Sequence, residues 1–143
     1  MKYSVKLSHA VHILIFIYLS EGVPLSSDKI AESIHTNPGC VRQIMSALRN
    51  AELIKCTTGH PRPELAREPK AISLLDVYKA VEGDKPLLHL DTHTNPECGI
   101  GVNIQLALQS FYDKVQKDAE KSMSVISLDD IIKEFQQRIE RLD

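Results

Sequence analysis

NPGCVRQIMSALRN, residues 37–50, is the segment that specifies the fold. Asn37 followed by Pro38 is a typical helix start, because asparagine caps free N–H groups and proline at the first helical position loses no hydrogen bond. At about 100° per residue, one face of this helix is apolar. It consists of Val41, Ile44, Met45 and Leu48. The opposite face is polar and basic, without an acidic residue. It consists of Gly39, Arg42, Gln43, Ser46 and Asn50, with Arg49 at its edge. A helix packed on one side and basic on the other suits the DNA major groove.

Two shorter helical patterns precede this segment. Apolar residues recur at helical spacing from Leu7 to Tyr18, and this pattern ends near residues 21–22. The apolar run at residues 11–19 is too short to cross a bilayer, so it predicts a buried helix and no membrane association. A second helix follows Pro24 and begins at Ser26 or Ser27.

A short hairpin is expected after residue 50. Residues 53–57 have the composition of a strand, residues 58–63 contain turn-forming glycine and prolines, and residues 64–67 form a return strand. A fourth helix is expected from Leu74 to Val81, closed by Gly83. Residues 1–83 are therefore predicted to form a winged helix-turn-helix DNA-binding domain.

The rest of the chain is expected to form a loop, residues 84–102, and a helical part, residues 103–143. In the helical part an apolar seam recurs at steps of four, three and four, a spacing that suits packing against another helix. It consists of Ile104, Leu108, Phe111 and Val115. Ser127 and Asp130 have the spacing of a capping box, and they predict the start of a last helix. Its inward residues are expected to be Ile131, Phe135, Ile139 and Leu142.

Composition narrows the classes of function. The 143 residues suffice for one core, and the net charge of −2 means that any basic surface must be local. The sequence has no HExxH, GxSxG, P-loop or glycine-rich dinucleotide turn, so an enzyme is not expected. Cys40, Cys56 and Cys98 form no CxxC pair, which predicts neither a disulfide framework nor a zinc ribbon and favours a reducing cytoplasm.

Four stretches, taken in their order and spacing, resemble one known family. They are Tyr3-Ser4-Val5-Lys6 with Ala10, residues 41–49, Leu65-Ala66-Arg67 through Ala80-Val81-Glu82-Gly83, and residues 95–105. Together they resemble the Rrf2 family of bacterial winged-helix repressors, which includes the iron–sulfur cluster regulator, the nitrite-sensitive repressor and the cysteine-metabolism repressor. The resemblance covers most of the chain.

The resemblance implies a mostly α fold with a small two-stranded β wing and a long dimerisation helix, here from about Asn103 to Ser122. It implies a recognition helix at residues 37–50 and a wing at residues 54–66. The expected function is that of a sequence-specific DNA-binding regulator, a repressor, which acts as a homodimer and responds to redox state or a small metabolite. Its expected partners are double-stranded DNA and a second copy of the chain.

The expected DNA-binding residues combine the outer face of the recognition helix with its flanks and the wing. They are Ser27, Asn37, Gly39, Arg42, Gln43, Ser46, Arg49, Thr58, His60 and Arg62. The expected dimer interface is the apolar seam from Ile104 to Val115.

Two features depart from the family pattern. In the wing, Thr58 stands where the family has an arginine, and Arg62-Pro63 replaces a glycine pair, so Arg62 or His60 would have to supply the charge for the minor groove. Cluster-binding members carry three cysteines between the fourth and fifth helices, whereas this chain has only Cys98 there. An iron–sulfur cluster is therefore not expected, and no cofactor is predicted.

Three alternatives remain open at this point. Cys98 is a candidate redox sensor, although an incidental thiol is the simpler interpretation. His89, His93 and Cys98 have residue types that bind metals, so a metal or cluster sensor is a second alternative. A dimeric protein-interaction module with the same fold and weakened DNA contacts is the third.

Overall fold

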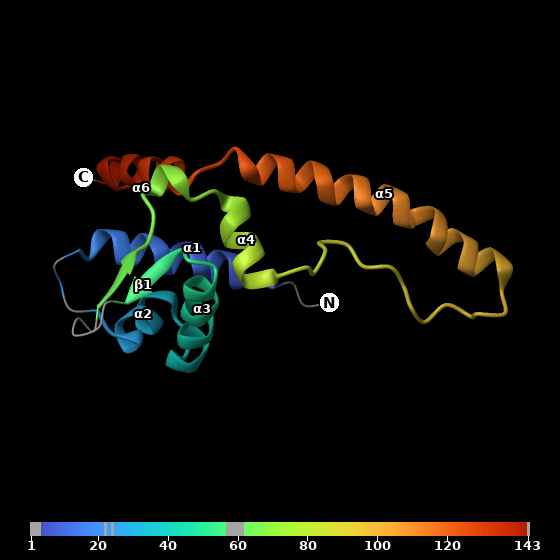
Figure 1. Ribbon diagram of the computed structural model, residues 1–143, viewed down its shortest axis with the longest axis horizontal. Coiled ribbons are helices and arrows are strands. Elements are labelled where there is room, and N and C mark those ends of the chain that lie inside the picture. Colours follow the sequence, from blue (N-terminus) through green and yellow to red (C-terminus); the bar gives the residue numbers. More distant parts are fainter. Residues whose placement is uncertain (1–3, 22, 24, 57–61, 143) are drawn as a thin grey trace.

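The structure is a computed structural model that describes residues 4–21, 23, 25–56 and 62–142. Within these residues the chain is mostly helical, with one two-stranded antiparallel sheet (Figure 1). Its elements in order are α1 (Lys6–Leu19), α2 (Ser27–Ile34), α3 (Pro38–Asn50), β1 (Ile54–Cys56), β2 (Pro63–Leu65), the 3-10 turn η1 (Pro69–Ala71), α4 (Leu74–Glu82), α5 (Gly99–Ser124) and α6 (Leu128–Leu142). The predicted fold class is confirmed.

Helix α1 is the central element of the N-terminal part. It packs against α2, α3, α4, α6 and β2, so apolar side chains are covered on more than one side. Its buried residues are Ala10, Ile13, Leu14 and Ile17. The stripe predicted from the sequence is therefore wrong in part: it omits the buried Ile13 and Ile17, and it includes Tyr18, which is 39% exposed. Its predicted members are Leu7, Ala10, Val11, Leu14, Ile15 and Tyr18. A helix with neighbours on several sides gives no single stripe in the sequence.

Helices α2 and α3 begin at capping side chains, as predicted. The Ser26 hydroxyl accepts a hydrogen bond from the Lys29 N–H, and Asn37 Oδ1 accepts one from the Cys40 N–H at 2.8 Å. Between the two helices, His35 has a left-handed backbone with φ of 66° and allows the sharp turn. The predicted apolar face of α3, Val41 through Leu48, is buried.

Strand β1 begins one residue after its predicted start at Leu53, β2 ends two residues before its predicted end at Arg67, and residues 57–61 lie outside the described residues. Strands β1 and β2 pair Ile54 with Leu65, Lys55 with Glu64, and Cys56 with Pro63. Pro63 was expected in the turn but begins β2, a position where proline's missing N–H is tolerated.

Helix α4 begins and ends as predicted. Ser73 and Asp76 form a reciprocal capping box at its start, and Gly83 closes it with φ of 60°. Helix α4 packs against α1, α3 and α5, so it connects the N-terminal core to the long helix α5.

Helix α5 begins at Gly99, four residues before the expected start at Asn103, so the loop ends at Cys98. Gly99 and Gly101 weaken the helical pattern in the sequence. The Cys98 side chain nevertheless caps the first turn by accepting a hydrogen bond from the Gly101 N–H. The helix extends well away from the N-terminal part, and the loop runs back beneath it (Figure 1).

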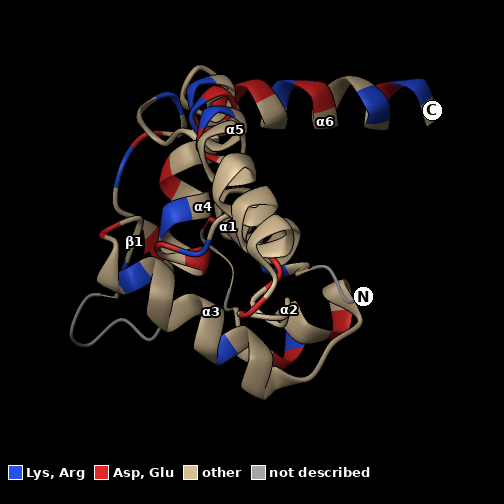
Figure 2. Cartoon of the chain, turned by 90° about the vertical axis from the view of Figure 1, so that its right-hand side faces the viewer, with Lys and Arg blue, Asp and Glu red and all other residues tan. Residues whose placement is uncertain are grey.

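Helix α6 packs only through its first turns. Ser127 and Asp130 form the predicted reciprocal hydrogen bonds, and Leu128 and Ile132 are buried. Ile139 and Leu142, expected to face inward, are 45% and 82% exposed. The helix contacts η1 and α1 near its start, and its later turns extend beyond the rest of the chain (Figure 2).

One polar contact between α1 and α2 has a consequence for stability. His12 Nε2 lies 2.9 Å from the Ser33 hydroxyl, across the interface of the two helices. Burial, and next the nearby His9, lower the pKa of His12 below its ordinary value of 6.5. The folded chain therefore favours the neutral imidazole.

We expect the free energy of unfolding to fall as the pH drops below about 6.5, because the unfolded chain then binds a proton at residue 12 before the folded chain does. Above that pH His12 is neutral in both the folded and the unfolded chain, so its contribution to the free energy of unfolding is constant. Urea denaturation at about pH 7.5 and about pH 5.5 measures the loss. His12→Gln should reduce the loss, whereas His93→Gln, in the exposed loop, should retain it. An identical loss in His12→Gln and the unmodified chain would contradict the prediction.

Candidate nucleic-acid interface

The outer face of α3 is exposed and basic. Arg42, Gln43, Ser46 and Arg49 are exposed, while the apolar face of the same helix is buried among α1, α2 and α4. Helices α2 and α3 lie on the side of the molecule opposite α5 and α6 (Figure 1). In the charge-coloured view, α3 shows basic colour only, whereas α2 carries both signs (Figure 2). The structure thus presents two guanidinium groups and one amide on a single rigid helix.

The N-terminal end of α3 is built from a capped turn. Asn37 Oδ1 is engaged by the Cys40 N–H, so only the remaining polar atoms of Asn37 are available to a ligand. A Cβ atom at Gly39 would lie 3.1 Å from Asn37 Oδ1, and glycine therefore leaves the capping oxygen undisturbed. Ser27, the first residue of α2, is half-buried.

Arg49 connects helix α3 to strand β1. Its Nη2 donates to Cys56 Sγ at 3.7 Å, which links the last turn of α3 to strand β1. The sequence pattern does not predict this pair, because the two residues come together only when α3 packs against β1. The contact restricts the directions that the Arg49 guanidinium can take.

Of the three expected wing residues, the structure places one. Thr58 and His60 lie outside the described residues. Arg62 lies just before β2, with Nη2 3.9 Å from Glu64 Oε1 and a side chain that is 29% exposed. An arginine this close to a carboxylate has part of its charge compensated before any ligand arrives.

The loop before α5 is held against that helix by glutamine side chains. The Leu87 N–H donates to Gln116 Oε1 and the Asp91 N–H donates to Gln105 Oε1, both at 2.9 Å. Gln116 Nε2 also donates to the Tyr78 hydroxyl, so the loop, α4 and α5 share one hydrogen-bond network. These contacts fix the path of the loop along the helix.

Cys98, His89 and His93 are all exposed, and Cys98 caps α5. Within the described ranges, no group of three or more histidine, cysteine, aspartate or glutamate side chains is arranged to hold a metal ion. Cys40 and Cys56 lie in α3 and β1, away from the loop. The structure does not bring the candidate metal ligands together.

The predicted apolar seam of α5 lies on the surface of the single chain. Ile104, Phe111 and Val115 are 52%, 65% and 47% exposed, and Leu108 is half-buried. Ile100 and Leu106 extend this exposed apolar surface. No helix among the residues described has the length and apolar character needed to span a membrane.

Comparison with known proteins agrees with this geometry. The profile of the Rrf2 family, described as iron-dependent transcriptional regulators, matches residues 3–134. The HTH-type transcriptional regulator YwnA of Bacillus subtilis (strain 168) is 37% identical over 127 residues, which cover 89% of this chain and 94% of YwnA.

Solved structures show the same architecture. One crystal structure is of a protein assigned as DNA-binding, whose sequence is 36% identical to this chain. The two structures superpose with a TM-score of 0.72 over 89% of this chain and 98% of that one. IscR of T. potens shares the fold at 24% identity, with a TM-score of 0.68 and coverage of 96% and 90%. CymR, the global cysteine regulator of B. subtilis, does so at 23% identity, with a TM-score of 0.63 and coverage of 92% and 95%.

The extent of the profile match and the similarity to YwnA establish the family. The two-stranded wing, the capped helix α3 and the long α5 are the parts of the structure that the sequence motifs had predicted. This chain belongs to the Rrf2 family of transcriptional regulators.

Proposed function

We propose that the chain binds a specific double-stranded DNA sequence as a homodimer and represses transcription from it. The observation that carries the proposal is the exposed face of α3, where Arg42 and Gln43 project from a helix whose other side is buried. Arginine and glutamine make bidentate contacts with guanine and adenine edges in the major groove. Two such helices in a two-fold dimer would contact half-sites about 34 Å apart.

The remaining expected contacts have supporting roles in this proposal. Ser46 and Arg49 extend the basic face toward the end of α3, while Asn37, Gly39 and Ser27 lie at the helix starts, where backbone N–H groups favour phosphate. Arg62, with Thr58 and His60, would approach the minor groove. Because Arg62 lies close to Glu64, its contribution is expected to be smaller than that of Arg42.

The second copy of the chain is proposed to cover the exposed seam of α5. Ile104, Phe111 and Val115 form an exposed apolar surface that a single chain would leave in water. Their spacing of four, three and four residues suits a helix–helix contact. Helix α5 lies on the opposite side of the molecule from α3, so pairing through α5 would leave both copies of α3 free (Figure 1).

The proposal assigns the chain no catalytic activity and a site of action in the cytoplasm, where bacterial DNA lies. The family description includes iron dependence, but the described residues do not fit an iron or cluster site, since the loop has one cysteine and no three-ligand group. No step of the proposed function therefore passes through a metal.

Arg42→Ala is expected to weaken operator binding by about 1–3 kcal/mol and to relax the preference at one base position, because it removes a bidentate contact. The measurement is a binding titration against the DNA upstream of the chain's own gene, at two salt concentrations. Arg141→Ala, which removes the same charge from the exposed end of α6, is the matched control and should bind as the unmodified chain does. Equal affinity of the two variants would count against the assignment of α3.

The same titration separates the DNA-binding proposal from a protein-interaction module. A DNA-binding protein loses affinity with salt at a log–log slope of about −0.9 per phosphate contacted. A module with weakened DNA contacts would show no binding above background and no such slope.

Phe111→Glu is expected to convert the dimer to a monomer, because an unpaired carboxylate in an apolar interface costs about 3–5 kcal/mol. Analytical ultracentrifugation at micromolar protein measures the change. Lys114→Glu, one turn away and 74% exposed, is the matched control and should remain dimeric. Phe111 is 65% exposed in the single chain, so circular dichroism should show an unchanged helix content. A Phe111→Glu variant that still sediments as a dimer would exclude the α5 seam.

Cys98 is proposed as the redox-responsive residue. Its exposed thiol would be oxidised by a peroxide, sulfur taking one oxygen to form a sulfenic acid while the peroxide is reduced to water or an alcohol. The observation that favours Cys98 is its capping contact with Gly101, because a bulkier oxidised sulfur would disturb the start of the proposed dimer helix.

Peroxide is expected to change the DNA affinity of the unmodified chain and to leave that of Cys98→Ser unchanged. The measurement is the operator titration before and after peroxide treatment. Cys56→Ser, which removes another exposed thiol, should keep the response. A normal response in Cys98→Ser would remove Cys98 from the mechanism.

A further inference from the structure

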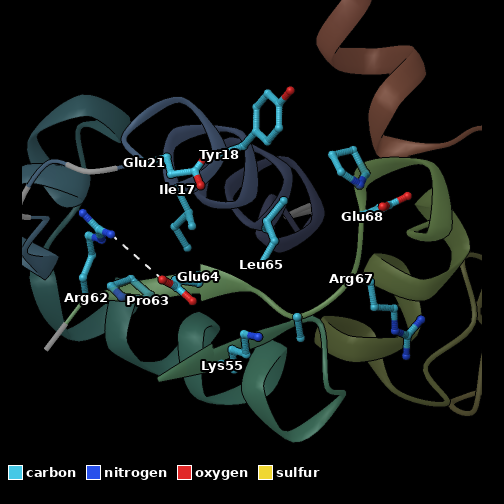
Figure 3. Close-up of a pocket in the computed structure, with 12 residues that line it drawn as sticks. Ile17, Tyr18, Glu21, Lys55, Arg62, Pro63, Glu64, Leu65, Arg67 and Glu68 are labelled. Atoms are coloured by element: carbon cyan, nitrogen blue, oxygen red, sulfur yellow. Dashed lines mark ion pairs between the residues drawn. The ribbon is translucent and has the colours of Figure 1, made fainter. Parts of the chain in front are cut away.

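A cavity of about 380 Å³ lies between the end of α1 and strand β2, outside the proposed interface on α3 (Figure 3). Ile17 projects from α1 toward β2, and Leu65 projects from β2 toward α1. Pro63 and Pro69 add further apolar wall. The apolar part of a ligand could therefore contact the cavity wall on two sides. The volume is large enough for a small organic molecule.

Two of the three basic side chains that line the cavity, Arg62 and Arg67, lie in ion pairs within the chain. Arg62 lies 3.9 Å from Glu64, and Arg67 lies 3.5 Å from Asp76. Lys55 stands directly opposite Glu64 in the register of the two strands. Lys55 forms no ion pair within the described residues, but two acidic lining residues, Glu21 and Glu68, form none there either, so the lining does not favour an anionic ligand.

The end of the cavity at α1 is negative. Glu21 lines it just beyond the last turn of α1, and no described ion pair engages its carboxylate. The C-terminus of a helix carries a partial negative charge, and the last turn of α1 has no basic residue to offset it. Two independent sources of negative potential thus lie at the α1 end of a cavity that has apolar wall at Ile17 and Leu65.

We propose that this cavity is a binding site for an organic cation, namely an amine or quaternary ammonium attached to an apolar body. The ammonium lies beside Glu21 and the carbonyl groups that end α1. The apolar body lies between Ile17 and Leu65. Because Glu64 and Leu65 form part of the same wall, the ligand touches β2, one of the two strands of the wing.

The test is isothermal titration of the free, full-length chain with 4-phenylbutylamine. 4-Phenylbutyrate, which has the same apolar body and the opposite charge, is the ligand control. The titration needs no DNA, so its result does not depend on whether the proposed DNA-binding function is correct. Saturable binding of one amine per chain is expected, with the carboxylate at least tenfold weaker.

Glu21→Gln is expected to weaken binding of 4-phenylbutylamine by about fivefold, the value of one unit charge at about 4 Å in a water-like medium. Glu140→Gln, an exposed carboxylate on α6, is the matched control and should bind as the unmodified chain does. Glu21 is exposed, so the fold should survive, and circular dichroism verifies it.

Three results would overturn the site. They are equal affinity for the amine and the carboxylate, unchanged affinity in Glu21→Gln, and no saturable binding of the amine into the millimolar range. Preferential, Glu21-dependent binding of the amine would establish it.

Discussion

The burial of one side of α3 against α1 and α4 is the interaction on which the rest of the structure depends. Val41 and Leu48 are fully buried, and together with Ile44 and Met45 they fix the rotation of the helix about its own axis. That rotation turns Arg42 and Gln43 outward. A helix free to rotate would present any side to solvent, whereas this one presents only its basic side. The packing of the core therefore also determines that Arg42 and Gln43, the proposed DNA-binding residues, face solvent.

A second constraint is that helix α5 leaves apolar side chains exposed to solvent in the single chain. Helix α5 is 26 residues long, yet it contacts mainly α4, and its apolar seam remains exposed. The described part of the loop, α4 and α5 are nevertheless tied by Gln105, Gln116 and Tyr78. These hydrogen bonds hold the loop against α5, and the side chains that form them come from the two helices that the loop connects. A second copy of the chain can then bury the seam without reordering the loop.

The residues of the wing contact other side chains of the chain and also border the cavity beside α1. Arg49 is braced against Cys56, and Arg62 is drawn toward Glu64, so both guanidinium groups already have a partner within the chain. The side of β2 that faces α1 borders a cavity whose α1 end is negative. The apolar body of a ligand bound there would lie against Leu65, next to Glu64, the carboxylate beside Arg62. Ligand and nucleic acid would thus act on one hydrogen-bonded hairpin, which gives the two sites a physical route for coupling.

The sequence by itself determined the local structure: the starts of α2, α3, α4 and α6, the buried face of α3 and the two-stranded wing. Capping hydrogen bonds and helical periodicity act between residues a few positions apart, so they are visible in one dimension. Only the tertiary structure decided the burial of Ile13 and Ile17, the exposure of Ile139 and Leu142, the Arg49–Cys56 contact and the cavity beside Glu21. Each of these depends on which distant elements pack around a residue, and packing partners are set by the whole fold rather than by spacing along the chain.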